Sequence, residues 1–405
     1  MQNIHIFTSA TTNYIPKAAV LAKSIKQHYP KLSFHLVLCD KLTPSISSEF
    51  ENQDIFDSII TIEDLPIPDI QSWIFKHDIV EMCTAVKGTA FKEIFRRYNC
   101  NKVFYFDPDM AVFSSIENLV TSLDKYSILL TPHFSKPQPN ELAVLDYEIS
   151  ALDHGVFNLG FLGIKDSEQG KLFLDWWENR LLNFCYDERE RGVFTDQKWI
   201  NFAPIFFSDI RILKESVYNV AIWNLTQRVV TGSLKEGIYM DGEPLCFYHF
   251  SGFDSQTDKK MLKKYNLGSQ LFELREWYSQ ELLKMKQTEF GDAVCFYSHF
   301  ENGTKISMKQ RVLYRASEEL QQKFQNPFAT SKGNKSFWGW YFASNTLEEE
   351  NKDEHLSTEK LQSLSNETLI RLLQKQQSEI IKMKRSKFWK LRDKILGLKR
   401  IFGLS

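Results

Sequence analysis

Short apolar runs alternate, over roughly the first 250 positions, with longer stretches in which apolar residues recur every three or four positions. The pattern begins with IHIFTSA, which predicts a strand over residues 4–10, and continues with a predicted helix over 15–30 whose apolar positions include Ile15 and Leu21. A second strand, SFHLVLCD, is predicted over 33–40. Strand, helix and strand in this order form a βαβ unit, which predicts an α/β fold with a mostly parallel sheet flanked by helices.

The same alternation continues to about residue 255. It predicts helices over 79–98, 115–123 and 170–184, and strands over 102–106, 126–134 and 245–250. Three glycines in the segment HGVFNLGFLGI suit close packing or a nearby ligand. Since ligands of α/β sheets bind at the carboxyl ends of the strands, the polar residues that follow each strand are the first candidates for chemistry.

The character of the chain changes after residue 255. We expect an α/β domain over 1–255, a mostly helical extension over 256–345, a polar linker over 346–366 and a basic amphipathic helix over 367–405. Residues 384–400 carry eight Lys or Arg and one Asp among apolar side chains. This composition favours peripheral contact with an anionic membrane surface, and a solvated helix or pairing with a second copy are the alternatives.

Composition and charge narrow the function classes. The 405 residues include 50 basic and 51 acidic side chains, so no charge imbalance indicates a nucleic-acid partner. Six widely spaced cysteines contain no CxxC pair, and we expect them to be reduced and mostly buried. The first twenty residues lack the basic and apolar regions of a signal peptide, and no apolar run approaches the roughly 20 residues of a membrane span, so we expect a cytoplasmic protein.

The most informative polar pair is Asp107 and Asp109, in KVFYFDPDM, directly after a predicted strand. A buried carboxylate is costly unless a cation or hydrogen bonds compensate it. An Asp-x-Asp at a strand end can direct two carboxylates at one divalent metal ion, which prefers oxygen ligands. The alternatives are an ordinary Asp-Pro-Asp turn and a phosphate-transfer nucleophile of the haloacid-dehalogenase type. In that phosphatase pattern a small residue and a threonine follow the pair, whereas Met110 and Ala111 follow it here.

Two later clusters follow predicted loops and strands. His249, in YHFSG, is either a satisfied structural histidine or a third ligand beside two carboxylates. Asp196 and Gln197, in TDQKWIN, are either hydrogen-bonding partners of sugar hydroxyls or the start of a helix capped by Thr195 or Asp196.

Six motifs in order carry a resemblance to a known family. These are FTSATTNYIPKAAVLAKSIKQHYP, TAVKGTAF, VFYFDPDM, GVFNLGFLGI, TDQ and YHFSG. In this order they resemble the nucleotide-sugar glycosyltransferases of the GT-A fold, closest to glycosyltransferase family 8 and related bacterial polysaccharide-biosynthesis enzymes. The resemblance extends over roughly residues 3–255. It implies a Rossmann-like GT-A catalytic domain and an enzyme of the hexosyltransferase type.

The resemblance also implies roles for individual residues. Asp107, Asp109 and His249 match the ligands of Mn²⁺ or Mg²⁺, and Gly252 is the glycine of the same histidine motif. Asn13 and Tyr14 match the nucleoside contacts, and Lys87 matches a basic residue near the donor sugar or phosphates. Asn158, Asp196 and Gln197 match residues around the donor sugar and the reaction centre. From the residues alone, Asn13 could be a turn residue, Tyr14 a core residue and Lys87 a solvated helix residue.

The sequence departs from the family at two places. The aspartates of the first loop are replaced by Thr11 and Thr12, which bears on base and ribose recognition. The Lys-Pro-Trp that follows the histidine motif is absent, so another cation must contact the diphosphate. We expect this cation to be one of three residues, Lys259, Lys260 or Arg228.

Tryptophans offer further candidates for sugar contacts. Trp176, Trp177, Trp338 and Trp340 have helical spacing that favours packing over sugar stacking. Trp223, Asn224 and Arg228, in IWNLTQR, are donor-side or acceptor-side candidates, because polar residues alternate with the tryptophan in a predicted loop.

Together these features predict a metal-dependent glycosyltransferase. We expect transfer from a UDP-linked donor, with retention of configuration, to a cell-surface glycan or a lipid-linked acceptor at the inner face of the membrane. The alternative from another class is a catalytically silent scaffold that binds a sugar nucleotide or a glycan, against which the intact trio of candidate metal ligands argues.

Overall fold

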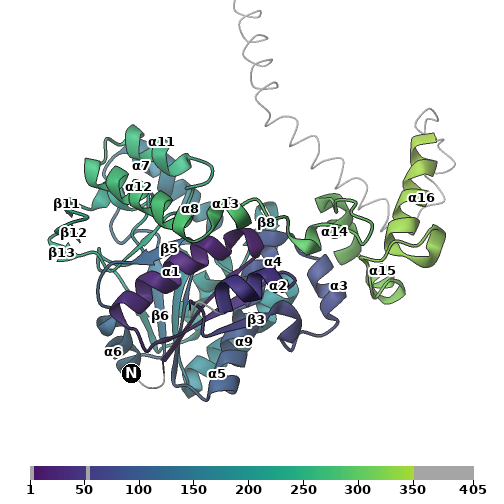
Figure 1. The fold of residues 1–405 in the computed structure, drawn as a ribbon, viewed down its shortest axis with the longest axis horizontal. Coiled ribbons are helices and arrows are strands. Elements are labelled where there is room, and N and C mark those ends of the chain that lie inside the picture. The colour runs from purple at the N-terminus through teal and green to yellow at the C-terminus, as the bar shows by residue number, and fades with distance from the viewer. Residues whose placement is uncertain (1–3, 52–54, 351–405) are drawn as a thin grey trace, which may run out of the picture. The chain divides into compact units, whose positions relative to one another are not determined.

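The structure is a computed structural model that describes residues 4–51 and 55–350 (Figure 1). The chain divides into two compact units, Met1–Gly339 and Trp340–Ser405, and the candidate chemistry lies in the first. Most of the predicted linker, from residue 351 on, and the whole predicted helix over 367–405 lie outside the described residues. Within the described part, no helix is both long enough and apolar enough to cross a bilayer.

A seven-stranded mixed sheet forms the centre of the described chain. Six of its strands are parallel to one another, and β7 runs antiparallel between β4 and β6. In spatial order the strands are β10 (Ile210–Ile212), β6 (Ile128–Pro132), β7 (Phe157–Lys165), β4 (Lys102–Phe106), β1 (Ile4–Ala10), β2 (Ser33–Leu38) and β3 (Ser58–Thr61). The predicted α/β class with a mostly parallel sheet is confirmed.

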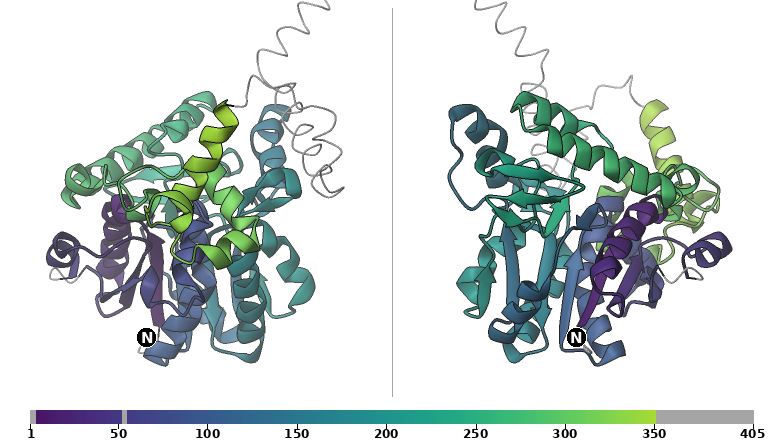
Figure 2. Two further views of the ribbon diagram at one scale, coloured as in Figure 1. Left: turned by 90° about the vertical axis from the view of Figure 1, so that its right-hand side faces the viewer. Right: turned by 60° about the vertical axis from the view of Figure 1, so that its left-hand side comes forward.

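Helices cover both faces of this sheet (Figures 1 and 2). Not all helices take part in this cover; the described residues form α1 (Ile15–His28), α2 (Pro44–Ile46), α3 (Ile70–Phe75), α4 (Ile79–Ala85), α5 (Lys87–Tyr98), α6 (Glu117–Lys125), α7 (Glu141–Ala143), α8 (Ile149–His154), α9 (Glu168–Phe184), α10 (Ala203–Phe206), α11 (Thr257–Lys264), α12 (Ser269–Lys284), α13 (Gln287–Phe290), α14 (Met308–Arg315), α15 (Glu318–Lys323) and α16 (Phe337–Glu350).

The alternation of side chains along each strand explains why both faces need cover. In β1, Ile6 packs into the core cluster that contains apolar residues of α1 and α6. The next residue, Phe7, points to the opposite face, where its ring lies 4.8 Å from that of Phe91 in α5. Phe91 in turn packs near Trp177 of α9, with 6.4 Å between ring centres. A strand buried on both faces directs apolar side chains to each of them, as Ile6 and Phe7 do here.

Small antiparallel sheets complete the first unit. They pair β5 (Met110–Val112) with β14 (Phe247–His249), β8 (Asp187–Glu188) with β9 (Val193–Phe194), and β12 (Gly237–Met240) with both β11 (Val230–Ser233) and β13 (Glu243–Pro244). The pairing of β5 with β14 matters most, because its register sets His249 opposite Met110, one residue after Asp109. Backbone pairing therefore joins two motifs that are about 140 residues apart in sequence.

The structure corrects the prediction of one helix over 79–98. That segment forms two helices, α4 and α5, which meet at Val86. The bend lies beside a close approach of two helices, because a Cβ atom on Gly88 would lie only 2.8 Å from the Cα of Glu178 in α9. Lys87, the first residue of α5, lies in the interior, where its side chain is 2% exposed.

The predicted extension contains helices α11 to α15 in the described residues, and they pack on the α/β part. Helix α12 contacts α1 and β11 (Figure 1). In α14, the buried guanidinium of Arg311 donates to the carbonyl oxygens of Phe75, at 3.0 Å, and Tyr297, at 2.7 Å. The predicted boundary at 255 falls in the turn before α11, inside the first compact unit, and the domain division remains a prediction.

Cysteines and aromatic residues behave as packing elements. All six cysteines are free, and five of them are buried. Trp177 is fully buried and stacks on Phe173, with 5.7 Å between ring centres. Trp176 packs edge-on against Phe206 at 5.6 Å. These two tryptophans therefore contribute to packing, as the helical spacing predicted.

Candidate active site

The Asp-Pro-Asp segment forms a tight turn between β4 and β5. The amide of Asp107 donates to the carbonyl oxygen of Gly160 at 2.7 Å, and the amide of Met110 donates to that of Asp107 at 3.2 Å. Gly160 lies so close that a Cβ atom there would be 2.9 Å from the Oδ2 atom of Asp107. The close approach of β7 to this turn thus explains Gly160, the first glycine in FNLGFLGI.

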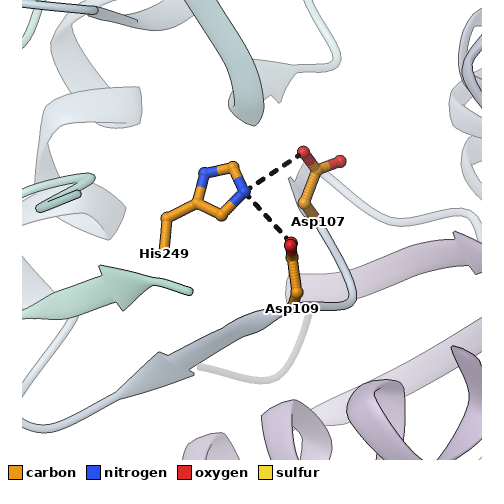
Figure 3. Close-up of side chains that lie close together, drawn as sticks. All are labelled: Asp107, Asp109 and His249. Atoms are coloured by element: carbon orange, nitrogen blue, oxygen red, sulfur yellow. Dashed lines mark ion pairs between the residues drawn. The ribbon is translucent and has the colours of Figure 1, made fainter. Parts of the chain in front are cut away.

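Asp107, Asp109 and His249 lie together at this turn (Figure 3). The Nε2 atom of His249 is 3.0 Å from the Oδ1 atom of Asp109 and 3.8 Å from the Oδ2 atom of Asp107. One ligand atom from each residue lies within 4.8 Å of the others. Two carboxylate oxygens and one imidazole nitrogen suit Mn²⁺ or a similar divalent ion. The donor set therefore fits the metal implied by the motifs, and the three residues form a possible metal site.

The titration of this trio follows from its burial and its mixed charges. Burial opposes the charged form of His249, but Asp109 and Asp107 raise its pKa above the ordinary value. Burial likewise opposes the charged form of Asp109, but His249 and, more weakly, Lys17 bring its pKa below the ordinary value. Without a metal, the imidazolium form of His249 is thus favoured by the carboxylates that it faces.

A second charged group, centred on Lys87, borders the trio. The Nζ atom of Lys87 lies 2.8 Å from the Oδ2 atom of Asp196 and 3.4 Å from the Oδ1 atom of Asp107, and it donates to the carbonyl oxygen of Leu159 at 3.0 Å. The hydroxyl of Tyr105 donates to Asp107 at 2.6 Å. Burial would lower the pKa of Lys87, but the two aspartates raise it. Burial raises the pKa of Asp196, against the effect of Lys87.

Asn158 and Gln197 lie next to this group and hold each other in place. The side-chain nitrogen of Asn158 donates to Gln197 Oε1 at 3.4 Å, and Gln197 Nε2 donates to the carbonyl oxygen of His154 at 3.0 Å. Asn158 Oδ1 accepts from the amide of Gly160 at 3.1 Å and from Asn219 Nδ2 at 2.9 Å. The contact from Asn219 was not predicted, because the only signal in the sequence is an isolated asparagine in a loop.

One cavity of about 420 Å³ gathers nearly all the predicted site residues. Its lining includes Asn13, Tyr14, Lys87, Asp107, Asp109, Asn158, Asp196, Gln197 and His249. Gly252 does not line it, although its neighbour Ser251 does; Gly252 has a φ of +78° and shapes the turn after β14. Two other clefts, of about 680 and 650 Å³, are larger, but neither contains the aspartate and histidine trio.

Of the three candidate residues in the IWNLTQR segment, Trp223 lines a cavity next to the main one, whereas Asn224 and Arg228 line neither of the two. Trp223 lies edge-on to His249, with 5.2 Å between ring centres, and lines an adjoining cavity of about 290 Å³. Asn224 is fully buried and holds the loop by donating to the carbonyl oxygens of His133 and Asn219. Arg228 donates to the carbonyl oxygen of Tyr218 at 3.3 Å, and burial lowers its pKa to about 10.

None of the three cations predicted for the diphosphate lines the main cavity. Lys259 and Lys260 are exposed on α11, and neither they nor Arg228 line the main cavity. A different lysine, Lys17, is buried behind Tyr14, with its Nζ atom 3.7 Å from the centre of the tyrosine ring. Its position on a helix with apolar neighbours gave no signal of this placement.

Comparisons with known proteins agree with the motifs. Residues 5–171 match the model of Glycosyl transferase family 8. This match confirms the resemblance and identifies the chain as a glycosyltransferase, in place of the phosphatase alternative.

Two proteins of Bacillus subtilis (strain 168) are relatives in sequence. "Uncharacterized protein YfnD" is 23% identical over 264 residues, which are 64% of this chain and 81% of that protein. "Uncharacterized protein YfnF" is 30% identical over 160 residues, which are 38% of this chain and 50% of that protein.

Among solved structures, the galactosyltransferase LgtC in complex with donor and acceptor sugar analogs is similar. It has 16% sequence identity and a TM-score of 0.41, with 70% of this chain and 96% of LgtC covered.

The ion pair of Lys87 and Asp196 predicts a large effect of one substitution. Lys87→Met leaves the carboxylate of Asp196 buried without its cation, and we expect the free energy of unfolding to fall by about 3–5 kcal/mol in urea denaturation. Lys92→Met is the matched control on the same helix. Lys92 is 37% exposed in its pairs with Asp175 and Glu178, so its loss should cost about 0–1 kcal/mol. Equal effects of the two substitutions would contradict this account of the buried pair.

Proposed function

We propose that this glycosyltransferase uses a divalent metal, Mn²⁺ or Mg²⁺, held by Asp107, Asp109 and His249. It transfers a sugar from a UDP-linked donor, with retention of configuration, to a cell-surface glycan or a lipid-linked acceptor. The observation that carries the proposal is the convergence of two carboxylates and one imidazole at the floor of the cavity that the other predicted donor-binding residues also line.

In this proposal, different residues of the cavity lining bind different parts of the donor and the acceptor. Asn13 and Tyr14, just after β1, contact the nucleoside, and the trio lies under the diphosphate. Asn158, Asp196 and Gln197 surround the donor sugar. The acceptor enters beside Trp223, because the cavity that this residue lines adjoins the main cavity and shares Asn158, Gln197 and Ser251 with it.

Sugar transfer breaks the bond between the anomeric carbon and a phosphate oxygen, and the diphosphate leaves with the electron pair. A bound divalent cation supplies positive charge that stabilises this leaving group. Asp196 is held by Lys87, and Asn158 and Gln197 are held by each other and by the backbone, so these groups need little reorganisation as positive charge develops at the anomeric carbon. The oxygen of an acceptor hydroxyl forms the new bond to the anomeric carbon, and its proton passes to the phosphate oxygen that departs.

The loss of one metal ligand tests the proposed enzyme against the silent scaffold. We expect the wild-type chain with Mn²⁺ to turn over one member of a panel of nucleotide sugars, and Asp109→Asn to lower the rate about 100-fold or more, because a metal supplies several kcal/mol to the transition state. Asp124→Asn, at a carboxylate that is 63% exposed, is the control and should leave the rate unchanged. Proton NMR of the fresh product reads its anomeric configuration.

The scaffold alternative gives a different result. A well-folded wild-type chain that binds UDP but turns over no donor in the panel would support it. A product with inverted configuration would contradict retention while leaving the enzyme class intact.

Mn²⁺ binding should depend on pH through His249. The pKa of this imidazole is raised above its ordinary value of 6.5 without metal, and a metal ligand must be neutral, so metal binding displaces a proton. The affinity for Mn²⁺ should therefore rise with pH through the raised pKa and level off above it, in calorimetric titrations. His249→Gln removes the titrating group, so its weaker affinity should vary little over the same range. An affinity that falls as pH rises would contradict the assignment of His249.

The basic segment 384–400 supports the proposal that the enzyme contacts the inner face of the membrane. It lies outside the described residues, so this proposal rests on its composition. Deletion of 384–405 should abolish co-sedimentation with vesicles that contain anionic lipid and leave the folding of the remaining chain unchanged. Unchanged co-sedimentation of the shortened chain would remove the idea of membrane contact through this segment.

A further inference from the structure

Lys17 is a buried cation beside the candidate active site to which the sequence analysis gave no role, although it lies within the first motif. It lies in the first turn of α1 and is 2% exposed. Its Nζ atom is 2.5 Å from the Oδ2 atom of Asp254. The hydroxyl of Tyr14 donates to the same oxygen at 3.1 Å. One carboxylate oxygen thus accepts from two donors, an ammonium and a phenol.

Lys17 and Asp254 differ in how firmly the surrounding structure holds them. Lys17 is fixed, because its helix packs on the central sheet and its aliphatic stem is buried. Asp254 belongs to a surface turn, and its side chain is 53% exposed. The turn has left-handed backbone at Gly252 and Gln256, on either side of Asp254. A buried ammonium needs an anionic partner, but here the partner is a side chain that can turn into solvent without leaving a cavity.

Lys17 and Asp254 lie beside the cavity in which we propose that the donor binds. Tyr14, whose ring lies against the Lys17 ammonium, lines the cavity together with Asp107 and Asp109. Lys17 is also close enough to the trio for its charge to act on Asp109. A cation and a hydroxyl that both hold one oxygen, at the edge of a cavity with a candidate metal site, have the chemistry of a phosphate-oxygen site.

We propose that Lys17 and Tyr14 bind an oxygen of the donor diphosphate, and that the carboxylate of Asp254 occupies this place until the donor displaces it. The inference rests on the proposed function. It gives the diphosphate a cation from α1 that lies directly against Tyr14, a residue of the cavity lining, whereas Lys17 itself, like Lys259, Lys260 and Arg228, is not a lining residue while Asp254 covers it. Since the phosphate oxygen and the carboxylate oxygen compete for the same two donors, Asp254 should weaken diphosphate binding, and its removal should strengthen it.

Calorimetric titration of the protein, in the presence of Mn²⁺, with inorganic pyrophosphate tests this site. The experiment requires no knowledge of the base or the sugar of the donor. We expect Lys17→Met to weaken pyrophosphate binding about 10-fold or more, because it removes a charge-assisted hydrogen bond. Asp254→Asn should instead tighten binding several-fold, because it removes the competing charge. Lys23→Met is the matched control on the same helix; Lys23 is 38% exposed and pairs with Glu281, so binding should not change.

The opposite directions of the two effects make the test decisive. A structural role of the Lys17 and Asp254 pair would make both variants bind more weakly, and that result would overturn the proposal. Unchanged binding by Lys17→Met, or no pyrophosphate binding by the wild type, would also overturn it. If Lys17→Met does not fold, the sign of the change in Asp254→Asn decides. Failure here leaves donor turnover and its loss in Asp109→Asn as the separate measure of the proposed function.

Discussion

Three carboxylates, those of Asp107, Asp109 and Asp196, converge near the end of β4, and the rest of the site depends on how their charge is compensated. Lys87 pairs with Asp196 and Asp107, and His249 faces Asp107 and Asp109. Neither cation comes from the turn after β4 that carries Asp107 and Asp109. The bend between α4 and α5 delivers Lys87, and the pairing of β14 with β5 delivers His249. The local departures from a regular α/β fold are thus the elements that place positive charge.

This charge balance leaves room for a further cation. The single charge of Lys87 is shared between two carboxylates, those of Asp107 and Asp196. The imidazole of His249 is protonated only because the nearby carboxylates raise its pKa. A divalent ion would replace that proton and compensate Asp107 and Asp109 more fully. A divalent cation and an anionic donor carry opposite charges, so the two bound together change the net charge of the cavity less than either one bound alone. The three carboxylates and their two partners therefore suit a metal that binds together with an anionic donor.

The role that we propose for Lys17 is that of a substrate site kept closed in the free protein. A buried ammonium with no anion would be costly, and a permanent partner would block a phosphate. An exposed carboxylate on a turn satisfies the ammonium and remains replaceable. In the sequence, Lys17 is one lysine in a helix of mixed apolar and basic residues, while Asp254 is 237 positions away, so neither residue indicates the other. Only their meeting next to Tyr14 makes them a candidate site.

The sequence alone was enough to predict the α/β class, the mostly parallel sheet and nine of the residues that line the cavity, because short apolar runs alternate with helical periodicity and because six motifs occur in order. It did not determine the break at Val86, the contact of Asn219 with Asn158, or the position of Lys17. Those features depend on the close approach of Gly88 to α9, on a loop that crosses the end of the sheet, and on a turn after β14. Periodicity is a local property of the chain, whereas the compensation of a buried charge is decided by residues that only the tertiary structure brings within a few ångströms.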